Sequence, residues 1–250
     1  IQDFKATADN LRVLFISDFN ENLEDLKNRL QTALNLLEKE IYIQRTGEDY
    51  EYLTDKEKDI EKEIANTQVE MSSVRSELAK IIFDRILTDR KIRYDHPNQD
   101  YSFTQKVDEE TISHREYELG IHVISPLHEH AGHLETLKMQ GMGKDELRIV
   151  LPEDDRLVND LLLYRKTEKY YQQNYGLTGQ EQVRDILIQK NLQNQDRLRS
   201  LQNRVSRLIT EAYFIVAGNE VDIHSSDSKT CIVQAFNQLM SHVSYPLSRG

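Results

Sequence analysis

The sequence has no tryptophan and only four prolines and nine glycines in 250 residues. All-β sandwiches need many tight turns, which glycine and proline supply, so this scarcity argues against that fold class. No apolar run approaches the roughly 20 residues that a helix needs to cross a bilayer, and no signal peptide is recognisable. We therefore expect a cytoplasmic chain that does not bind a membrane.

The chain has a single cysteine, Cys231. One thiol excludes an internal disulfide framework and is typical of proteins from reducing compartments. Cys231 begins the apolar run CIVQAF, so we expect it to be buried by packing rather than to act as a reactive thiol.

The phosphate-binding loop G-x-x-x-x-G-K-[ST] is also absent. The most similar stretch, Gly141-Met142-Gly143-Lys144, lacks the upstream glycine and the hydroxyl residue after the lysine. It also precedes a predicted strand, whereas the phosphate-binding loop precedes a helix. No Ser-His-Asp or Cys-His arrangement is recognisable either. We therefore expect no catalytic residue, no cofactor-binding residue and no bound ATP in this chain.

Charged residues are abundant, at 30% of the chain against 38% hydrophobic residues, and the net charge is −11. This balance suits long, exposed helices with narrow apolar stripes. A strongly acidic chain is not a general nucleic-acid binder, because phosphate contacts need clustered lysine and arginine. The chain also opens without an initiator methionine, and we interpret it as a domain cut from a longer protein.

The apolar periodicities predict a helix-rich α+β fold in four consecutive segments. Residues 1–53 are expected to form a winged-helix-like module and residues 54–90 a long helix. An α+β segment is expected over 91–180, and a second long helix, a hairpin and a final helix over 181–250.

The winged-helix-like start combines a leucine-bearing helix with a hairpin. Its leucines recur at spacings of three and four, which places them on one helical face: Leu23, Leu26, Leu30, Leu34 and Leu37. The run IYIQRTGEDYEYLT then alternates apolar and polar residues on both sides of Thr46-Gly47, which is typical of a two-stranded wing.

Two long helices are predicted, at about 54–88 and 181–212. Thr54 and Glu57 have the spacing of a capping box, and no proline or glycine interrupts the following stretch. Its apolar residues have a heptad-like spacing that includes Met71, Val74 and Leu78. Because stripes this narrow need a partner, we expect the two helices to pack side by side as an antiparallel coiled coil.

The remaining pattern predicts a small β-sheet or hairpins. The runs YELGIHVIS (Tyr117–Ser125) and ELRIVLP (Glu146–Pro152) have β character, and AYFIVAGNEVDI predicts a hairpin around Gly218-Asn219. Helices are expected from Asp154 to Tyr171 and from Ser228 to Val243.

One cluster has the composition of a metal site, His128-Glu129-His130-x-x-His133. Imidazoles two and three residues apart can share a metal, with Glu129 as an oxygen donor. The spacing differs from H-E-x-x-H, and the cluster lies in a glycine-containing loop where polar residues are common. We therefore expect a solvated loop without a metal. His122, inside a predicted strand, is expected to be a packed or edge histidine.

Arg197, Arg204 and Arg207 project from one sector of the second long helix, because steps of seven and three return close to the same angle. Such a face could contact DNA phosphates or an acidic partner, or it could be solvated. In the winged-helix-like module the basic residues have acidic neighbours: Lys27, Arg29 and Lys39 are matched by Glu24, Asp25, Glu38 and Glu40. DNA contact therefore stays an alternative to protein binding.

Several stretches, read in order, carry a family resemblance. YEYLTDKEKDIEKEI leads from an aromatic strand into an L-T-x-E-E-x-x-I-x-x-E-I-like helix start. IIFDRIL and KIRYDHPNQDYSFTQKVD give a helix end, a K-Y-R-Y-like strand and an F-x-F-x-x-x-V-D-like segment. YELGIHVISP, ELRIVLPEDDRLVNDLLLYRKTEKYYQQN, EAYFIVAGNEVDI and SHVSYPLS follow. From about Leu23 onward, this order resembles the region downstream of the ATPase core in BrxC, the P-loop ATPase family of the BREX phage-defence systems.

The resemblance implies an ATPase subunit whose Walker-type motifs lie upstream of this region. It implies ATP and Mg²⁺ for the full-length protein, but no residue of this chain matches those motifs. Tyr52, Thr54, Glu57 and Val107-Asp108 match family patterns that we interpret as structural. The resemblance leads us to expect a non-catalytic structural and interaction region that binds other BREX components or itself.

Overall fold

The computed structural model describes residues 5–16, 18, 22–46, 48–94 and 98–244. The expected turn glycine, Gly47, lies outside the described residues. So do residues 95–97 of the KIRYDHPN run and the last half of SHVSYPLS.

The chain divides into two compact units, each built from two separate stretches. The first, which we name the α3 unit, comprises Ile1–Gln68 and Lys166–Gln193. The second, the sheet unit, comprises Val69–Arg165 and Asn194–Gly250. These units interleave along the chain, whereas the four segments expected from the sequence are consecutive.

The α3 unit begins with two helices and a hairpin, and the second helix and the hairpin are the leucine-bearing helix and the wing that the sequence predicted. Its elements are α1 (Ala8–Leu14), α2 (Leu23–Lys39), β1 (Ile43–Thr46), β2 (Asp49–Tyr52) and α3 (Asp55–Asn66), with parts of α6 (Asp155–Asn174) and α7 (Glu181–Thr210). β1 and β2 pair antiparallel. Leu26 and Leu34 are buried, but Leu23 is 50% exposed, so the leucine stripe is only partly covered.

The predicted capping box begins α3. Oγ1 of Thr54 accepts a hydrogen bond from the N–H of Glu57 at 3.3 Å, and Oε2 of Glu57 accepts one from the N–H of Thr54 at 2.7 Å. Each side chain thereby satisfies a backbone donor that the first helical turn leaves free.

The predicted continuous helix over 54–88 is wrong. α3 ends at Asn66, and the next helix, α4 (Met71–Lys80), begins only at Met71. Between them Thr67 is extended, with φ −63° and ψ 122°, and its hydroxyl donates to the carbonyl of Glu63 at 2.8 Å. A threonine hydroxyl that binds the preceding turn competes with helix continuation, although neither proline nor glycine marks the break.

Side chains from α6 complete the end of α3. Lys166 donates to the carbonyl of Ala65, and Lys169 donates to the carbonyl of Gln68 at 2.7 Å. The last carbonyls of a helix have no partner within it, so Lys166 supplies one, while Lys169 binds the segment that follows α3. The contact joins residues far apart in the sequence, so local periodicity does not reveal it.

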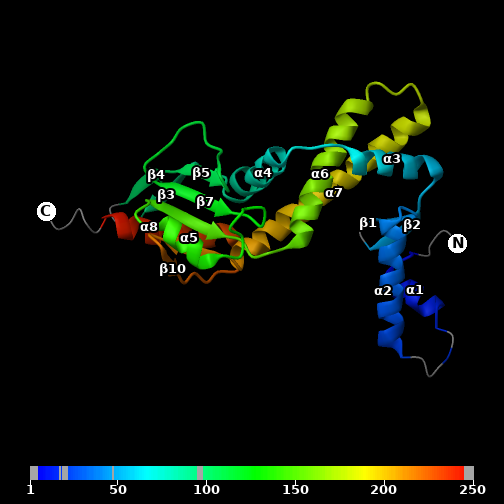
Figure 1. The fold of residues 1–250 in the computed structure, drawn as a ribbon, viewed down its shortest axis with the longest axis horizontal. Helices are drawn as coiled ribbons and strands as arrows, with labels where there is room; N and C mark the ends of the chain where they lie inside the picture. The colour runs from blue at the N-terminus through cyan, green and yellow to red at the C-terminus, as the bar shows by residue number, and fades with distance from the viewer. Residues whose placement is uncertain (1–4, 17, 19–21, 47, 95–97, 245–250) are drawn as a thin grey trace. The chain divides into compact units, whose positions relative to one another are not determined.

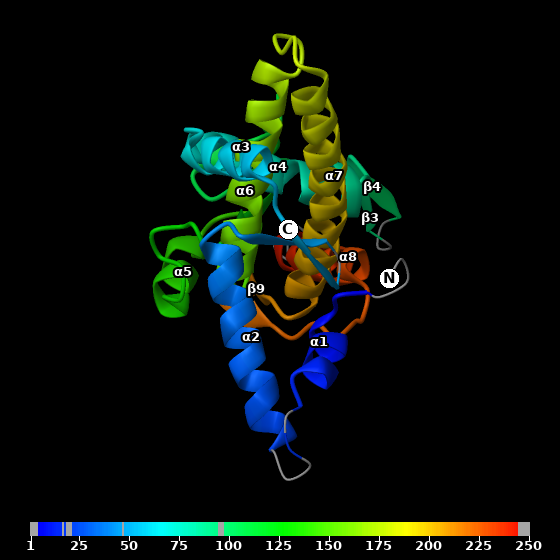
Figure 2. The same ribbon diagram turned by 90° about the vertical axis from the view of Figure 1, so that its right-hand side faces the viewer.

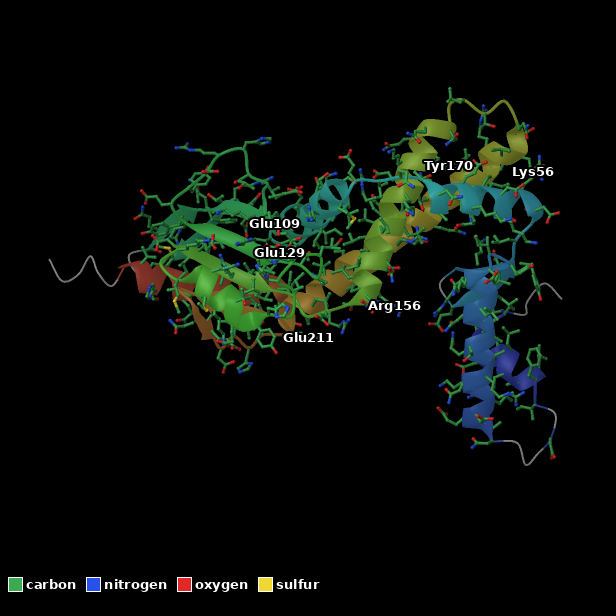
Figure 3. All side chains as sticks on the ribbon, viewed as in Figure 1. Lys56, Glu109, Glu129, Arg156, Tyr170 and Glu211 are labelled. Carbon is green, nitrogen blue, oxygen red and sulfur yellow. The ribbon has the colours of Figure 1, made fainter. Side chains whose placement is uncertain are left out.

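Lys190 of α7 binds two further elements of the α3 unit. This lysine is only 4% exposed. Its Nζ donates to Oε1 of Gln44 on β1 at 2.7 Å and also binds the carboxylate of Glu61 on α3. The hydroxyl of Tyr170, which Figure 3 labels on α6, donates to Glu63 of α3, and burial together with this carboxylate raises the pKa of Tyr170.

In the sheet unit, α4 continues into a π-helix, η1 (Ile81–Ile86). The N–H of Leu87 donates to the carbonyl of Ile82 at 2.7 Å, five residues back rather than four. Val74 and Leu78 are fully buried, as predicted, whereas Met71 is 40% exposed, contrary to prediction.

The helix that runs alongside α7 is α6, not the 54–88 segment. α7 is unbroken from Glu181 to Thr210, close to the predicted 181–212, and α6 lies antiparallel beside it (Figures 1 and 2). A short loop joins the two helices, which favours an antiparallel pair. In the sheet unit, apolar residues from both helices share one core: Leu157, Leu161 and Tyr164 from α6 with Leu198, Leu201, Val205 and Leu208 from α7.

The sequence predicted a small β-sheet or hairpins. The structure has one six-stranded sheet, in the order β10-β9-β8-β7-β5-β6. The central strands β5 (Thr104–Val107), β7 (Gly120–Ile124) and β8 (Glu146–Val150) are parallel. The antiparallel strands are β6 (Glu110–Thr111), β9 (Tyr213–Val216) and β10 (Asn219–Val221), and a separate hairpin pairs β3 (Lys91–Tyr94) with β4 (Gln99–Ser102). The β9–β10 hairpin and the final helix, α8 (Ser228–Ser244), confirm two predictions, and the fold is helix-rich α+β as expected.

The two faces of this sheet differ, because successive side chains of a strand point to opposite faces. One face contributes Ile121, Val123, Leu147 and Ile149 to the main core, which also holds the fully buried Cys231 of α8. The other face carries α5 (Leu134–Gly141), whose Leu137 packs with Ile124, Val150 and Ile215. The same face bears the charged residues described next.

Candidate functional site

Three basic side chains form a row on the α5-bearing face of the sheet. The parallel register places Lys106 of β5 beside His122 of β7, and His122 beside Arg148 of β8. Glu146 lies on the same face, since residues two apart on a strand share a face. We name these four residues the sheet-face cluster.

Glu146 is the carboxylate that the three basic side chains surround. Its Oε1 lies 2.8 Å from Nε of Arg148 and 3.4 Å from Nδ1 of His122, and its Oε2 lies 3.5 Å from Nζ of Lys106. Burial raises the pKa of this carboxyl. The hydrogen bonds with His122 and Arg148 have the larger combined effect and lower the pKa to about 2. Glu146 is therefore ionised at neutral pH although it is only 6% exposed.

Arg148 joins the sheet to α5. Its Nη1 donates to the carbonyl of Leu137 at 2.8 Å, and its Nη2 donates to the carbonyl of Gln140 at 3.0 Å. The carbonyl of Gln140 belongs to the last turn of α5, where a helix has acceptors without partners of its own. The guanidinium thus binds two carbonyls and one carboxylate while only 2% exposed, which gives it a structural role.

A cavity of about 240 Å³ lies beside the cluster, where the parallel strands begin. Its charged lining residues have both signs: Lys106 and Lys144 with Glu116, Glu118, Asp145 and Glu146. The hydroxyl of Thr104, which also lines it, donates to the carbonyl of Tyr117 at 3.1 Å and accepts from the N–H of Tyr117 at 2.6 Å. The lining residues include neither serine nor cysteine, so this cavity offers charge pairing without an activated nucleophile.

The carboxyl ends of the parallel strands, where open α/β sheets commonly bind ligands, carry a second buried cluster. Asp108 follows β5 and accepts hydrogen bonds from the N–H and the hydroxyl of Ser125, which follows β7, at 2.7 and 2.8 Å. Burial raises the pKa of Asp108 above its ordinary value, although the bonds from Ser125 act in the opposite direction. This pair fastens two strand ends together.

His128 does not activate Ser125. Its Nε2 lies 3.4 Å from the carboxylate of Glu109, and its Nδ1 accepts the N–H of His130 at 3.0 Å. Both ring nitrogens are thus engaged with groups other than the Ser125 hydroxyl, which itself donates to Asp108. The Asp-Ser-His composition of this strand end is not a catalytic triad, since a triad needs a bond from the base to the nucleophile.

The candidate metal-binding histidines have different environments. The His128 side chain is only 7% exposed, which differs from the expected solvated loop, and its ring lies 5.6 Å from that of His130. His133 is exposed at the start of α5. Figure 3 labels Glu109 and Glu129, the carboxylates that contact His128 and His130. In the part of the chain that the structure describes, no group of three or more His, Cys, Asp or Glu is placed to hold a metal ion.

Two of the three arginines singled out on α7 bind an aspartate of the same unit. Nη1 of Arg204 lies 3.0 Å from Oδ2 of Asp154, and Nη2 of Arg207 lies 3.3 Å from the same oxygen. Burial raises the pKa of Asp154, but the N–H of Leu157 and the guanidinium of Arg204 lower it below its ordinary value. Arg197 instead donates to a side-chain amide of α7 itself. Two arginines of the predicted helix face are therefore part of an ion-pair network within the sheet unit.

The Gly141–Lys144 segment does not fit a nucleotide phosphate. Gly141 is the last residue of α5, and Lys144 lies shortly before β8. Phosphate loops direct backbone N–H groups from a helix N-terminus, whereas this turn follows a helix C-terminus, whose carbonyls disfavour anions. The residues present there do not fit a Mg²⁺–ATP site.

Sequence reasoning missed the sheet-face cluster. The available signal was that His122 and Arg148 each interrupt an apolar strand run. From this signal, two unusual strand residues can be recognised, but not their proximity to Lys106 and Glu146. Their assembly depends on the register of parallel strands that are distant in sequence.

Comparison with protein families identifies most of the sheet unit. Residues 67–239 match the family model described as the BREX ATP-binding protein BrxC 4th domain with six-stranded beta sheet, and the sheet observed here has six strands. No solved structure matches the chain. None of the helices in the described residues is both long and apolar enough to span a membrane.

Proposed function

This chain belongs to the BrxC family of BREX ATP-binding proteins, and we propose that it acts there as a non-catalytic structural and interaction region. In this proposal it links the ATPase of the full-length protein to other BREX components in the bacterial cytoplasm. ATP and Mg²⁺ bind outside this chain, which holds no cofactor of its own.

The observation that carries the proposal is how the buried charged groups of the sheet unit are bonded. Glu146 and Arg148 bind each other, Arg148 also binds the end of α5, and Asp108 binds Ser125. An enzyme site keeps a nucleophile or acid turned toward a substrate, with a base within reach. In the described residues of the sheet unit, these groups instead join strands to one another and to α5. Such bonding suits a rigid platform for binding.

The helix–helix–hairpin start is proposed as a protein-binding module of winged-helix type. Its basic residues are interspersed with acidic ones, and the chain as a whole carries a charge of −11. DNA phosphates favour a continuous basic surface, which this module lacks. On α7, Arg204 and Arg207 already neutralise Asp154. These charges favour protein over DNA as the partner.

Two binding experiments test this function. Sedimentation velocity with each purified BREX component should detect a complex, while the fluorescence anisotropy of labelled duplex DNA should stay unchanged at 150 mM salt, on the order of physiological ionic strength. DNA affinity that falls steeply with the logarithm of salt, and that an Arg204→Gln/Arg207→Gln variant abolishes, would establish the DNA-contacting alternative instead. An Arg199→Gln variant is the matched control, because Arg199 is exposed on the same helix.

A further inference from the structure

The sheet unit has a second, larger groove that the clusters described above do not use. It has a volume of about 600 Å³, and its lining residues come from the α4–η1 helix, from β5 and from the segment after β6. Ala79, Phe83, Phe103 and Ile112 give it apolar walls, and Gln105 and Arg115 line it as well. We name it the η1 groove. Its size is in the range of binding pockets for ligands with several functional groups.

The π-helix forms part of one wall of the η1 groove. Phe83 and Asp84, both in η1, line it. π-helical turns are rare, because their hydrogen bonds span five residues, and they occur frequently at functional sites. A helix that departs from α geometry beside a groove of this size is the first indication of binding there.

Gln105 gives the η1 groove an unused hydrogen-bonding group. The residue is only 4% exposed, and its backbone is occupied: its N–H donates to Oγ of Ser113 at 3.2 Å, and its carbonyl accepts from the N–H of Ile112 at 2.8 Å. Its side-chain amide, in contrast, has no hydrogen-bond partner among the described residues. The amide reaches the solvent in the groove, so it is available to a ligand that supplies both a donor and an acceptor.

The rim of the η1 groove is more basic than the chain as a whole. Lys80, Arg90 and Arg115 line it, together with the single carboxylate of Asp84. Arg90 lies 3.3 Å from Asp84, and Lys80 lies 3.2 Å from Glu77. The guanidinium of Arg115 lies 5.3 Å from the ring centroid of Tyr117 and forms no ion pair within the described residues. This arginine is available to an external carboxylate.

We propose that the η1 groove binds an extended peptide segment of a partner protein, in which apolar side chains alternate with carboxylates. In an extended strand, the N–H and C=O of one residue point to the same side, so they match Oε1 and Nε2 of the Gln105 amide. An apolar side chain of the segment packs against Ile112, which is only half-buried, and a carboxylate binds Arg115. The proposal rests on the interaction role described above and identifies the surface and the chemistry of the partner.

A peptide fits the η1 groove better than a single-stranded nucleic acid. Binding of unpaired bases relies on stacking against open aromatic rings. Phe83 and Phe103 are 1% and 3% exposed, so they present little ring surface. Tyr117 is the more exposed aromatic residue of the groove, and Arg115 lies over its ring.

Titration of the ¹⁵N-labelled chain with two blocked peptides tests the proposal. The probes are acetyl-Glu-Leu-Glu-Leu-amide and acetyl-Lys-Leu-Lys-Leu-amide, which carry the same apolar side chains. The acidic peptide should shift the amide resonances of Gln105, Ser113 and Arg115 saturably, and the basic one should not. Gln105→Leu and Arg115→Gln should each weaken the acidic peptide at least tenfold, while Gln234→Leu and Arg199→Gln, on exposed positions of α8 and α7, should leave it unchanged.

Equal binding of both peptides, or no saturable shift with either, overturns the proposal. So does a dT oligonucleotide that shifts the same resonances in place of the acidic peptide. The ¹⁵N spectrum of each variant shows whether it is folded. If the chain binds a BREX component and both groove variants bind it equally well, the groove proposal fails while the interaction role stands. If no component binds the chain at all, the interaction role itself fails.

Discussion

Arg148 and Glu146 lie two residues apart on β8, and Nε of the arginine lies 2.8 Å from Oε1 of the glutamate. Both side chains are almost completely buried. Removal of one partner from a buried ion pair leaves an uncompensated charge, which costs far more than the loss of an exposed pair. This relationship makes the α5-bearing face of the sheet sensitive to single substitutions.

The first prediction concerns Arg148→Met, which keeps the length of the side chain but removes its charge and its donors. Glu146 and two carbonyls of α5 lose their partner, so the free energy of unfolding should fall by about 3–5 kcal/mol in urea denaturation at pH 7. Arg199→Met is the control, because Arg199 forms an exposed pair with Asp196. It should cost less than about 1 kcal/mol. A similarly small loss for Arg148→Met would show that the pair does not support the sheet.

The second prediction is the acid dependence of stability that Glu146 causes. Its pKa is about 2 in the folded chain against an ordinary 4.5, so its contribution is complete above about pH 5 and is lost as the pH falls toward 2. This difference corresponds to about 3 kcal/mol. The raised pKa of Asp108 acts with the opposite sign and favours the fold as the pH falls. Comparison of the chain with Glu146→Gln isolates the first effect.

Unfolding free energies at pH 6, 4.5 and 3 give this comparison. The stability advantage of the chain over Glu146→Gln should shrink as the pH falls. Parallel curves for the two proteins would contradict the role assigned to Glu146.

The third prediction contrasts two residues of α4. Leu78 is fully buried in the main core, whereas Met71 is 40% exposed. Leu78→Asp should therefore destabilise the sheet unit by several kcal/mol or unfold it, and Met71→Asp should change stability by about 0.5 kcal/mol or less. Thermal unfolding followed by circular dichroism measures both. Comparable losses for the two variants would show that α4 is packed differently.

The fourth prediction tests the capping box of α3. Thr54→Ala removes the side-chain acceptor for the N–H of Glu57 and should cost about 1 kcal/mol. Thr54→Ser keeps the hydroxyl and should restore most of this loss. Amide hydrogen exchange in the first turn of α3 should accelerate only in the alanine variant. Equal exchange in both variants would mean that the cap does not stabilise the helix end.

Short-range patterns in the sequence predicted several elements well. The Thr54 and Glu57 spacing defined the start of α3, because the cap depends on residues within one helical turn. The apolar stripe of α7 and the turn around Gly218 were likewise predicted from neighbouring residues. These are features in which local geometry and the final structure agree.

Features set by distant residues escaped prediction. Lys166 and Lys169 bind carbonyls on either side of the break after Asn66, from a helix about 100 residues away. We expected α7 to pack beside a helix over 54–88, but α6 lies beside it in the structure. The sheet-face cluster was not predicted, because it requires the register of three strands. The contact of His128 with Glu109 likewise joins two loops that are separate in the sequence.

Sedimentation velocity of the fluorescently labelled chain with each purified BREX component, in the presence and absence of Mg²⁺–ATP, examines the proposed interaction role. The chain should sediment faster with at least one component, and the fraction bound should be the same with and without nucleotide, because the chain lacks a nucleotide-binding motif. If the chain sediments unchanged with every component, or faster only when duplex DNA is added, it is not the protein-binding region proposed.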